Sequence, residues 1–206
     1  VKKAAAITNN NAGLLPKDKA DAIVRACDEV IAGKWAEEFI VDAIQGGAGT
    51  SANMNMNEVI ANRAGELLGC PKGSYKIVHP NDHVNMAQST NDVIPTAGKL
   101  TVLDLLAPLE KALGRLEREL AKKAEEFDDV ITMGRTQLQD AVPIRLGQVF
   151  HGYASMVARD RKRIEKAHKE MYTVNLGGTA VGTAINVSDS YFYKIVPNLE
   201  KLTGYP

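Results

Sequence analysis

The sequence predicts an all-α protein in which an N-terminal helical domain is followed by part of a long helix bundle. Aromatic residues make up only 5% of the 206 residues, and alternating β-branched runs are scarce. Apolar residues instead recur at helical spacing through two long stretches, 91–127 and 142–172. At about 1.5 Å per residue, each stretch would form a helix of about 45 Å or more. Helices so much longer than the average of about 11–12 residues need long partners beside them, as in a bundle.

The first part of the chain differs, because its helical patterns are shorter and are separated by turns. The predicted short helices cover residues 16–32, 34–44 and 53–68. Gly69 ends the last of them, and we expect the polar stretch 75–85 to lead irregularly into the first long helix. We place a domain boundary near Gln88. This gives an N-terminal helical domain of residues 1–88 and a bundle segment of residues 89–206.

Two apolar seams define the long helices, each with an alternating four-three spacing. The first seam is Val102, Leu106, Leu109, Leu113, Leu116 and Leu120. The second is Leu146, Phe150, Tyr153, Val157, Ile164, Ala167 and Met171, interrupted only by the carboxylate of Asp160. The glycine-rich segment 175–183 should interrupt the second helix, and a third bundle helix should begin near Ser188. The chain lacks an initiator Met and starts within a helical pattern, so we expect both domains to be incomplete.

Charge and cysteine content argue against several functions. Lys plus Arg and Asp plus Glu each number 25, so the chain offers no electrostatic footprint for nucleic acid or an anionic membrane. Cys27 and Cys70 show no C-x-x-C spacing and the histidines do not cluster, so no disulfide scaffold, metal site or cofactor is expected. No run approaches about eighteen apolar residues, and no secretory signal opens the chain. We expect a soluble, cytoplasmic protein.

Three short runs of hydroxyl and amide side chains stand immediately before long helical patterns. These runs are residues 49–53, 88–92 and 134–140. The first N–H groups of a helix lack intrahelical partners and lie at the positive end of the helix dipole. Because a carboxylate placed there meets ready donors, three such helix ends predict a site for a small dicarboxylate.

Five ordered blocks resemble the aspartase/fumarase superfamily. They are GGAGTSANMNMNEVIANRA (46–64), HPNDHVN (79–85), STND (89–92), GRTQLQDAVP (134–143) and LGGTAVGT (176–183). The resemblance implies a homotetrameric lyase with a long central helix bundle. Such a lyase cleaves a C–N or C–O bond of a dicarboxylate to give fumarate, at sites assembled from three subunits.

By this resemblance, two groups of residues bind the substrate. Thr50, Ser89 and Thr90 would hold the substrate carboxylate on which negative charge develops during the reaction. Asn91, Thr136 and Gln137 would hold the departing group. Elimination passes through a doubly negative aci-carboxylate, which preorganised donors would stabilise. The alternative is that Ser51, Ser89 and Thr90 are ordinary helix N-caps.

Residue 137 separates the two main activities of the superfamily. Fumarase-like sequences and some aspartases carry histidine there, whereas this chain carries Gln137, as other aspartases do. Glutamine does not titrate near neutral pH, so it can orient a ligand but cannot act as an acid or a base. The sequence therefore favours the reversible elimination of ammonia from L-aspartate, with fumarate hydratase as the alternative.

The catalytic base of the superfamily is not found in this sequence. It is a serine in a flexible loop with the pattern Ser-Ser-x-Met-Pro-x-Lys-x-Asn, and the chain contains no Ser-Ser pair. We therefore expect the chain to be a fragment of a lyase that is inactive alone. A non-enzymatic helical assembly module of the same family remains the alternative.

His79, Asn81 and Asp82 match a secondary anion-binding region of fumarase-like members. The alternative is a loop in which Asn81 and Asp82 bond to turn backbone. The remaining histidines are isolated along the sequence, so we expect surface or bundle contacts for them.

Overall fold

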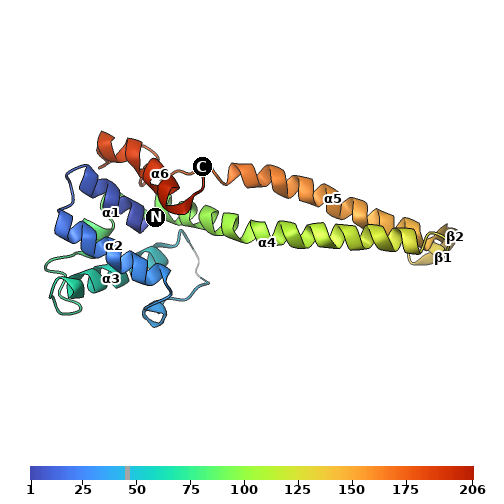
Figure 1. The fold of residues 1–206 in the computed structure, drawn as a ribbon, viewed down its shortest axis with the longest axis horizontal. Coiled ribbons are helices and arrows are strands. Elements are labelled where there is room, and N and C mark those ends of the chain that lie inside the picture. Colours follow the sequence, from blue (N-terminus) through green and yellow to red (C-terminus); the bar gives the residue numbers. More distant parts are fainter. Residues whose placement is uncertain (45–46) are drawn as a thin grey trace. The chain divides into compact units, whose positions relative to one another are not determined.

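The computed structural model describes residues 1–44 and 47–206, so Gly46 of the first superfamily block lies outside the described residues. The long elements are helices, accompanied by a two-stranded antiparallel sheet, and the all-α class is confirmed (Figure 1). The α-helices are α1 (Lys2–Asn11), α2 (Lys17–Ile31), α3 (Thr50–Leu67), α4 (Thr90–Glu126), α5 (Leu146–Glu170) and α6 (Asp189–Thr203). The short elements are the 3₁₀ helix η1 (Ala36–Glu38), the π-helical η2 (Pro80–Val84), and the strands β1 (Ile131–Thr136) and β2 (Gln139–Arg145). Among the described residues, no helix combines the length and apolar character that crossing a membrane would require.

Contacts divide the chain into two compact units. The core unit, as we call it, contains Val1–Lys99 and Val174–Pro206, and the hairpin unit contains Leu100–Thr173. Helix α4 begins in the core unit and continues through the hairpin unit. The domain limits expected from the sequence, 1–88 and 89–206, are not tested by this division and stay a prediction.

Small side chains let α1 pack closely in the core unit. Its successive alanines Ala4, Ala5 and Ala6 are buried, and α1 contacts both α2 and α6. Ser188 caps α6, because its Oγ accepts a hydrogen bond from N of Tyr191 at 3.2 Å. The helix expected to start near Ser188 is therefore present. The buried face of α6 packs against α1 inside the core unit. The C-terminal helix is therefore part of the same unit as the N-terminal helices.

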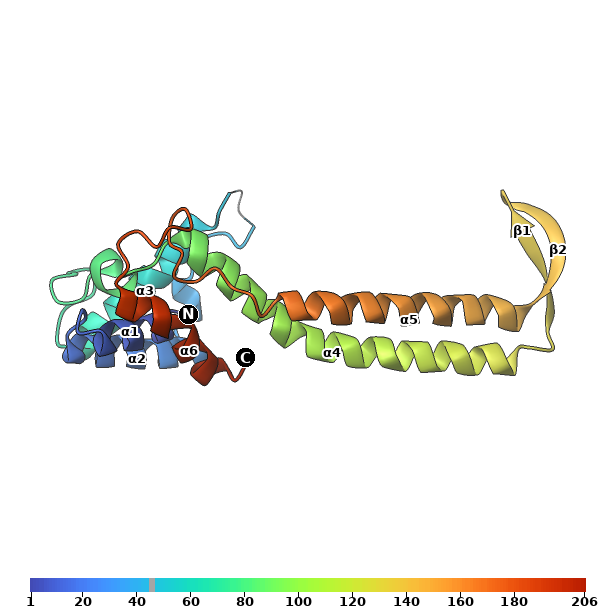
Figure 2. The ribbon, with the colours of Figure 1, turned by 90° about the horizontal axis from the view of Figure 1, so that it is seen from above.

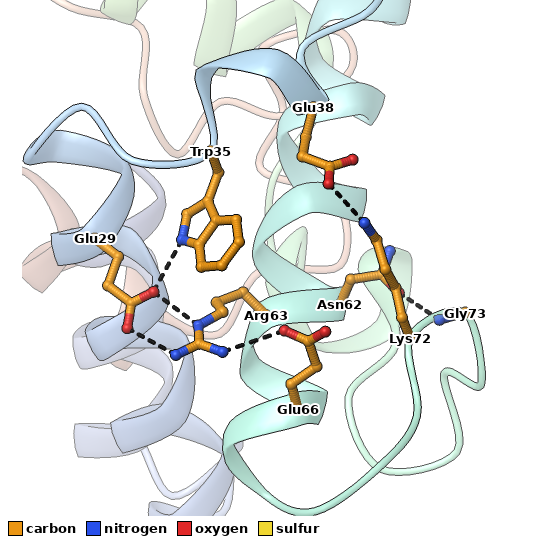
Figure 3. A network of polar contacts seen from close by, with 8 residues as sticks. All are labelled: Glu29, Trp35, Glu38, Asn62, Arg63, Glu66, Lys72 and Gly73. Atoms are coloured by element: carbon orange, nitrogen blue, oxygen red, sulfur yellow. Dashed lines mark hydrogen bonds and ion pairs between the residues drawn. The ribbon is translucent and has the colours of Figure 1, made fainter.

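A polar network joins the edges of α2 and α3 (Figure 3). The Glu29 carboxylate accepts hydrogen bonds from Nε of Arg63 at 2.7 Å and from Nε1 of Trp35 at 2.9 Å. The guanidinium of Arg63 also pairs with Glu66 at 3.2 Å and lies 5.1 Å from the centre of the Trp35 ring. These hydrogen bonds, chiefly that from Arg63, lower the pKa of Glu29 to about 2. The network satisfies its own charges, so we assign it a structural role.

In the hairpin unit, α5 runs beside α4, as Figures 1 and 2 both show. Gly147 permits the close approach where α5 begins, because a Cβ there would lie 2.4 Å from the carbonyl oxygen of Ala124. Only part of the predicted leucine seam is covered. Leu109 and Leu116 are exposed in this chain, as is Leu105 beside them at 63%. The two helices therefore leave much of their apolar surface without a partner.

Strands β1 and β2 replace the start of the second predicted long helix. They pair from Ile131 opposite Arg145 to Thr136 opposite Gln139, and α5 begins only at Leu146. The prediction of a helix from Val142 is wrong, because residues 131–145 alternate between the faces of a hairpin.

The predicted helix over 34–44 is also wrong, since only η1 forms there. Trp35 adopts a left-handed backbone with φ of 65°. The side chain of Asn55 hydrogen-bonds to the backbone that follows Trp35. Its Nδ2 donates to the carbonyl oxygen of Glu38 at 2.9 Å, and its Oδ1 accepts from N of Val41 at 3.3 Å. These bonds compete with helical ones. Elsewhere, α3 begins at Thr50, earlier than expected, and the irregular stretch contains η2.

Candidate functional site

The first turns of α3 and α4 lie against each other in the core unit. Gly49, the N-cap of α3, has φ of 83°, and a Cβ added to it would lie 3.1 Å from Cγ2 of Ile94. A hydrogen bond joins the two turns, because Nδ2 of Asn53 donates to Oγ1 of Thr90 at 3.0 Å. The first turns that carry Thr50 and Thr90 therefore lie side by side.

Ser89 and Asp92 cap α4 reciprocally. Oγ of Ser89 accepts from N of Asn91 at 3.3 Å, and Oδ1 of the fully buried Asp92 accepts from N of Ser89 at 2.9 Å. This arrangement is a capping box. The N-cap interpretation of Ser89 is confirmed, whereas Thr90 and Ser51 lie inside the first turns of α4 and α3. Because Ser89 Oγ acts as an acceptor in the cap, its hydroxyl proton can still be donated to a ligand.

The glycine-rich segment after α5 is hydrogen-bonded to the first turn of α4. Oδ2 of Asp92 accepts from N of Gly177 at 3.2 Å and from N of Thr179 at 3.0 Å. Asn91 donates from Nδ2 to the carbonyl oxygen of Ala180 at 2.7 Å, and its own carbonyl oxygen accepts from Nδ2 of Asn175 at 3.0 Å. Asp92 was not singled out from the sequence. The available signal was its position three residues after Ser89.

Thr136 and Gln137 lie in the hairpin unit, where Thr136 ends β1 and Gln137 lies in the turn to β2. The expectation that this run precedes a helix directly is wrong. Gln137 and Leu138 form the tight turn with φ of 49° and 64°, a left-handed conformation that costs free energy in residues other than glycine. Their side chains are exposed, as is that of Thr136. Of the six predicted substrate residues, four therefore share the core unit and two lie in the hairpin unit.

The secondary anion-binding region coincides with η2. His79 is its N-cap, and Nδ1 of His79 accepts from N of Asp82 at 3.3 Å, while the side chains of Asn81 and Asp82 are exposed. His83 accepts from N of His79 through Nδ1 at 2.8 Å. Burial lowers the pKa of His83, and the nearby charge of Lys19 adds to this effect. The turn therefore uses His79 as a cap, and an anion-binding role for this region stays a prediction.

Buried polar residues beneath the helix ends were also not anticipated from the sequence. Lys2 is only 6% exposed, and its Nζ donates to Oδ1 of Asn85 at 2.7 Å. Burial lowers the pKa of Lys2 to about 7, against the opposing effect of the Asp92 charge. The alanine-rich pattern around Lys2 gives no hint of this contact, because the partner is far away in the sequence.

The fold is helical, and hydroxyl and amide side chains gather at the adjoining first turns of α3 and α4. Within residues 1–44 and 47–206, no group of three or more His, Cys, Asp or Glu side chains is placed to hold a metal ion. A family profile described as Lyase matches residues 1–206. Aspartate ammonia-lyases from a Bacillus species and from Escherichia coli K12 are 54% and 47% identical to the chain over its whole length. The chain belongs to this lyase family, the aspartase/fumarase superfamily.

Solved structures agree with this assignment. A fumarate lyase:delta crystallin from Brucella melitensis, bound to cobalt, superposes with a TM-score of 0.88 and 52% identity. A class II fumarase from Schistosoma mansoni gives a TM-score of 0.86 and 41% identity. Each match covers 98% of this chain, but only 44% and 43% of those proteins. The chain likewise spans 44% and 43% of the Bacillus and Escherichia coli relatives.

Proposed function

We propose that the protein carrying this chain is an aspartate ammonia-lyase, which reversibly eliminates ammonia from L-aspartate to give fumarate. The observation that carries the proposal is Gln137, an amide where fumarase-like sequences place histidine. The names and identities of the relatives support it. A small dicarboxylate is therefore the proposed ligand.

The converging helix ends suit the charge that develops in this elimination. Removing a proton next to a carboxylate creates a doubly negative aci-carboxylate, which needs donors that are already in place. We assign this carboxylate to Thr50, Ser89 and Thr90, whose hydroxyls lie at the first turns of α3 and α4. The reacting anion would also meet the positive ends of both helix dipoles.

The departing ammonium needs acceptors. Asn91 uses Nδ2 to bond Ala180, and none of the described residues donates to its Oδ1, which is therefore available to accept from an ammonium group. We assign this role to Asn91, together with Thr136 and Gln137. A glutamine can hold an ammonium group through its amide oxygen without exchanging a proton with it.

We further propose that the complete protein is a homotetramer whose sites combine several subunits. The incompletely covered leucines of α4 support this, because an exposed apolar seam marks an interaction surface. A cytoplasmic location is part of the proposal and is supported by the free thiols of Cys27 and Cys70. Since the chain contains no Ser-Ser base motif, we expect these 206 residues alone to have no lyase activity.

Fumarate hydratase is the second candidate, favoured by the likeness to the Schistosoma fumarase. The test is the absorbance of fumarate formed by the complete protein from L-aspartate and from L-malate. We expect rapid deamination of L-aspartate and a far lower rate with L-malate. Comparable rates on the two substrates would remove the preference for an ammonia-lyase.

A further inference from the structure

A series of hydrogen-bonded polar side chains, two of them buried, leads from Lys2 to Thr90. Nζ of Lys2 donates to Oδ1 of Asn85 at 2.7 Å. Nδ2 of Asn53 donates to the same oxygen at 3.4 Å and to Oγ1 of Thr90 at 3.0 Å. Lys2 is 6% exposed and Asn53 only 2%. This series of hydrogen bonds connects α1, the turn after η2, α3 and the first turn of α4, all within the core unit.

The direction of each bond follows from the first member of the series. While Lys2 carries its proton, its ammonium group donates and cannot accept, so Asn85 must present its amide oxygen to Lys2. That oxygen can only accept, so Asn53 must turn its Nδ2 toward it. The same nitrogen donates to Thr90. The single hydroxyl proton of Thr90 must therefore point away from Asn53.

We propose that Asn53 is a positioning residue which, held by Lys2 through Asn85, directs the hydroxyl proton of Thr90 toward the substrate carboxylate. The inference rests on the proposed function for the identity of the ligand. Oδ1 of Asn53 is buried with no hydrogen-bond partner among the described residues, so this side chain is held through its Nδ2 alone.

The same helix provides a matched control. Asn57 lies one turn after Asn53 in α3, is fully buried, and also has an Oδ1 without a partner in the described part of the chain. Its Nδ2 contacts Sδ of Met54 at 3.6 Å. Replacing Asn57 by Asp therefore buries a carboxyl group in the same helix without changing the group that faces Thr90.

The test is Asn53→Asp, which turns the donor that faces Thr90 into an acceptor. The Thr90 proton would then turn toward residue 53 and be lost to the ligand. In the complete protein, we expect kcat/KM for L-aspartate to fall by about 10²-fold, as for the loss of an oxyanion donor. Succinate, an unreactive dicarboxylate, should bind about tenfold more weakly by titration calorimetry, whereas Asn57→Asp should change either value by less than about twofold.

A double-mutant cycle shows whether Asn53 acts through Thr90. In a Thr90→Val background, Asn53→Asp should cause no further loss in kcat/KM or in succinate binding, because the hydroxyl is already gone. Asn53→Ala, checked for folding by circular dichroism, replaces Asn53→Asp if the latter does not fold. Equal effects at positions 53 and 57, or additive losses in the cycle, would overturn the inference.

The experiment distinguishes failure of the proposed function from failure of the role proposed for Asn53. If the wild-type protein binds succinate but forms no fumarate from L-aspartate or L-malate, the proposed function falls and the succinate measurements still decide the role of Asn53. If it does not bind succinate at all, Thr90 does not serve a dicarboxylate and the inference falls as well.

Discussion

The two compact units differ in what they bury. All the buried polar side chains among the described residues belong to the core unit: Lys2, Thr8, Asn9, Asn53, Asn57, Asp92, Thr96 and Thr179. The buried apolar side chains of the hairpin unit are limited to Leu103, Ala154 and Val157 in the part of the chain that the structure describes. The hairpin unit instead exposes large apolar side chains along both of its helices.

This difference indicates how each unit is stabilised. The core unit closes its own interior and can hold polar groups there because most of them are hydrogen-bonded. The hairpin unit has too few neighbours to bury its seams, and polar contacts such as the hydrogen bond between Glu110 and His168, at 3.2 Å, lie between its helices. Buried, hydrogen-bonded polar groups are therefore a feature of the core unit, whereas exposed apolar seams are a feature of the hairpin unit.

The largest expected effect compares one proposed site residue from each unit. In the complete protein, Asn91→Ala and Thr136→Val should each reduce kcat on L-aspartate by about 10²–10³-fold, or roughly 2.7–4 kcal/mol. Thr136→Val should leave the melting temperature unchanged because Thr136 is exposed, whereas Asn91→Ala should lower it by a few degrees because Asn91 anchors the glycine-rich segment.

Two controls accompany these variants. Thr132→Val alters a threonine in the same hairpin, and Asn175→Ala removes a bond to the Asn91 backbone while keeping the Asn91 side chain. Both controls should keep near-normal kcat. A variant at Asn91 or Thr136 that melts lower but turns over normally would mark that residue as structural only.

The second prediction tests the exposed seam. The isolated chain should self-associate in sedimentation velocity at high micromolar concentration, because association would remove the exposed side chains of Leu109 and Leu116 from water. Leu109→Lys with Leu116→Lys should abolish association, at about 1.5–3 kcal/mol for each leucine buried in the assembly. Glu125→Gln, an exposed charge change on the same helix, should have no effect. A monomeric, folded wild-type chain would count against the interface.

The third prediction concerns the buried ammonium of Lys2. Because burial lowers its pKa from 10.5 to about 7, the unfolded chain binds a proton in that interval that the folded chain does not. Stability should therefore rise with pH above about 7, by at most about 1.4 kcal/mol per pH unit. Urea unfolding from about pH 7 to about pH 8 stays below the ordinary pKa of the Cys27 thiol, 9.0, and measures this slope.

Lys2→Met should remove the part of that slope due to Lys2, since methionine fills the site without a titrating group. The smaller part that remains belongs to the buried α-amino group of Val1, whose pKa burial also lowers. Lys3→Met is the control, because Lys3 lies on the same helix but pairs with Asp28 at 2.6 Å near the surface. Equal slopes in wild type and Lys2→Met would show that Lys2 is not held in a low-pKa environment.

The smallest effect belongs to the surface network of the core unit. The pKa of Glu29 is lowered from 4.5 to about 2, so its contribution to stability is complete above 4.5 and is lost as the pH falls toward 2. Arg63→Gln should destabilise the chain at neutral pH by on the order of 1 kcal/mol, because both partners are partly exposed. The difference should vanish near pH 2 in acid-unfolding curves followed by circular dichroism. Lys72→Gln, which breaks a more exposed pair with Glu38, should have a smaller effect.

Some features could be predicted from the sequence because they depend on neighbours along the chain. The helical seam predicted α4 closely, with 91–127 expected and Thr90–Glu126 observed. The superfamily blocks identified the family, which the relatives confirm. The run around Ser89 identified a helix start, because capping involves residues only a few positions apart.

Other features were decided only by the tertiary structure. Asn53 and Thr90 are 37 residues apart, and Asp92 and Gly177 are 85 residues apart, so no local pattern reveals that they bond. Asn55 suppressed a helix over 34–44 by binding its backbone, and the strands of residues 131–145 stabilise each other only as a pair. Helix periodicity and caps are properties of a segment, whereas the direction of a buried hydrogen bond depends on which distant groups share the interior.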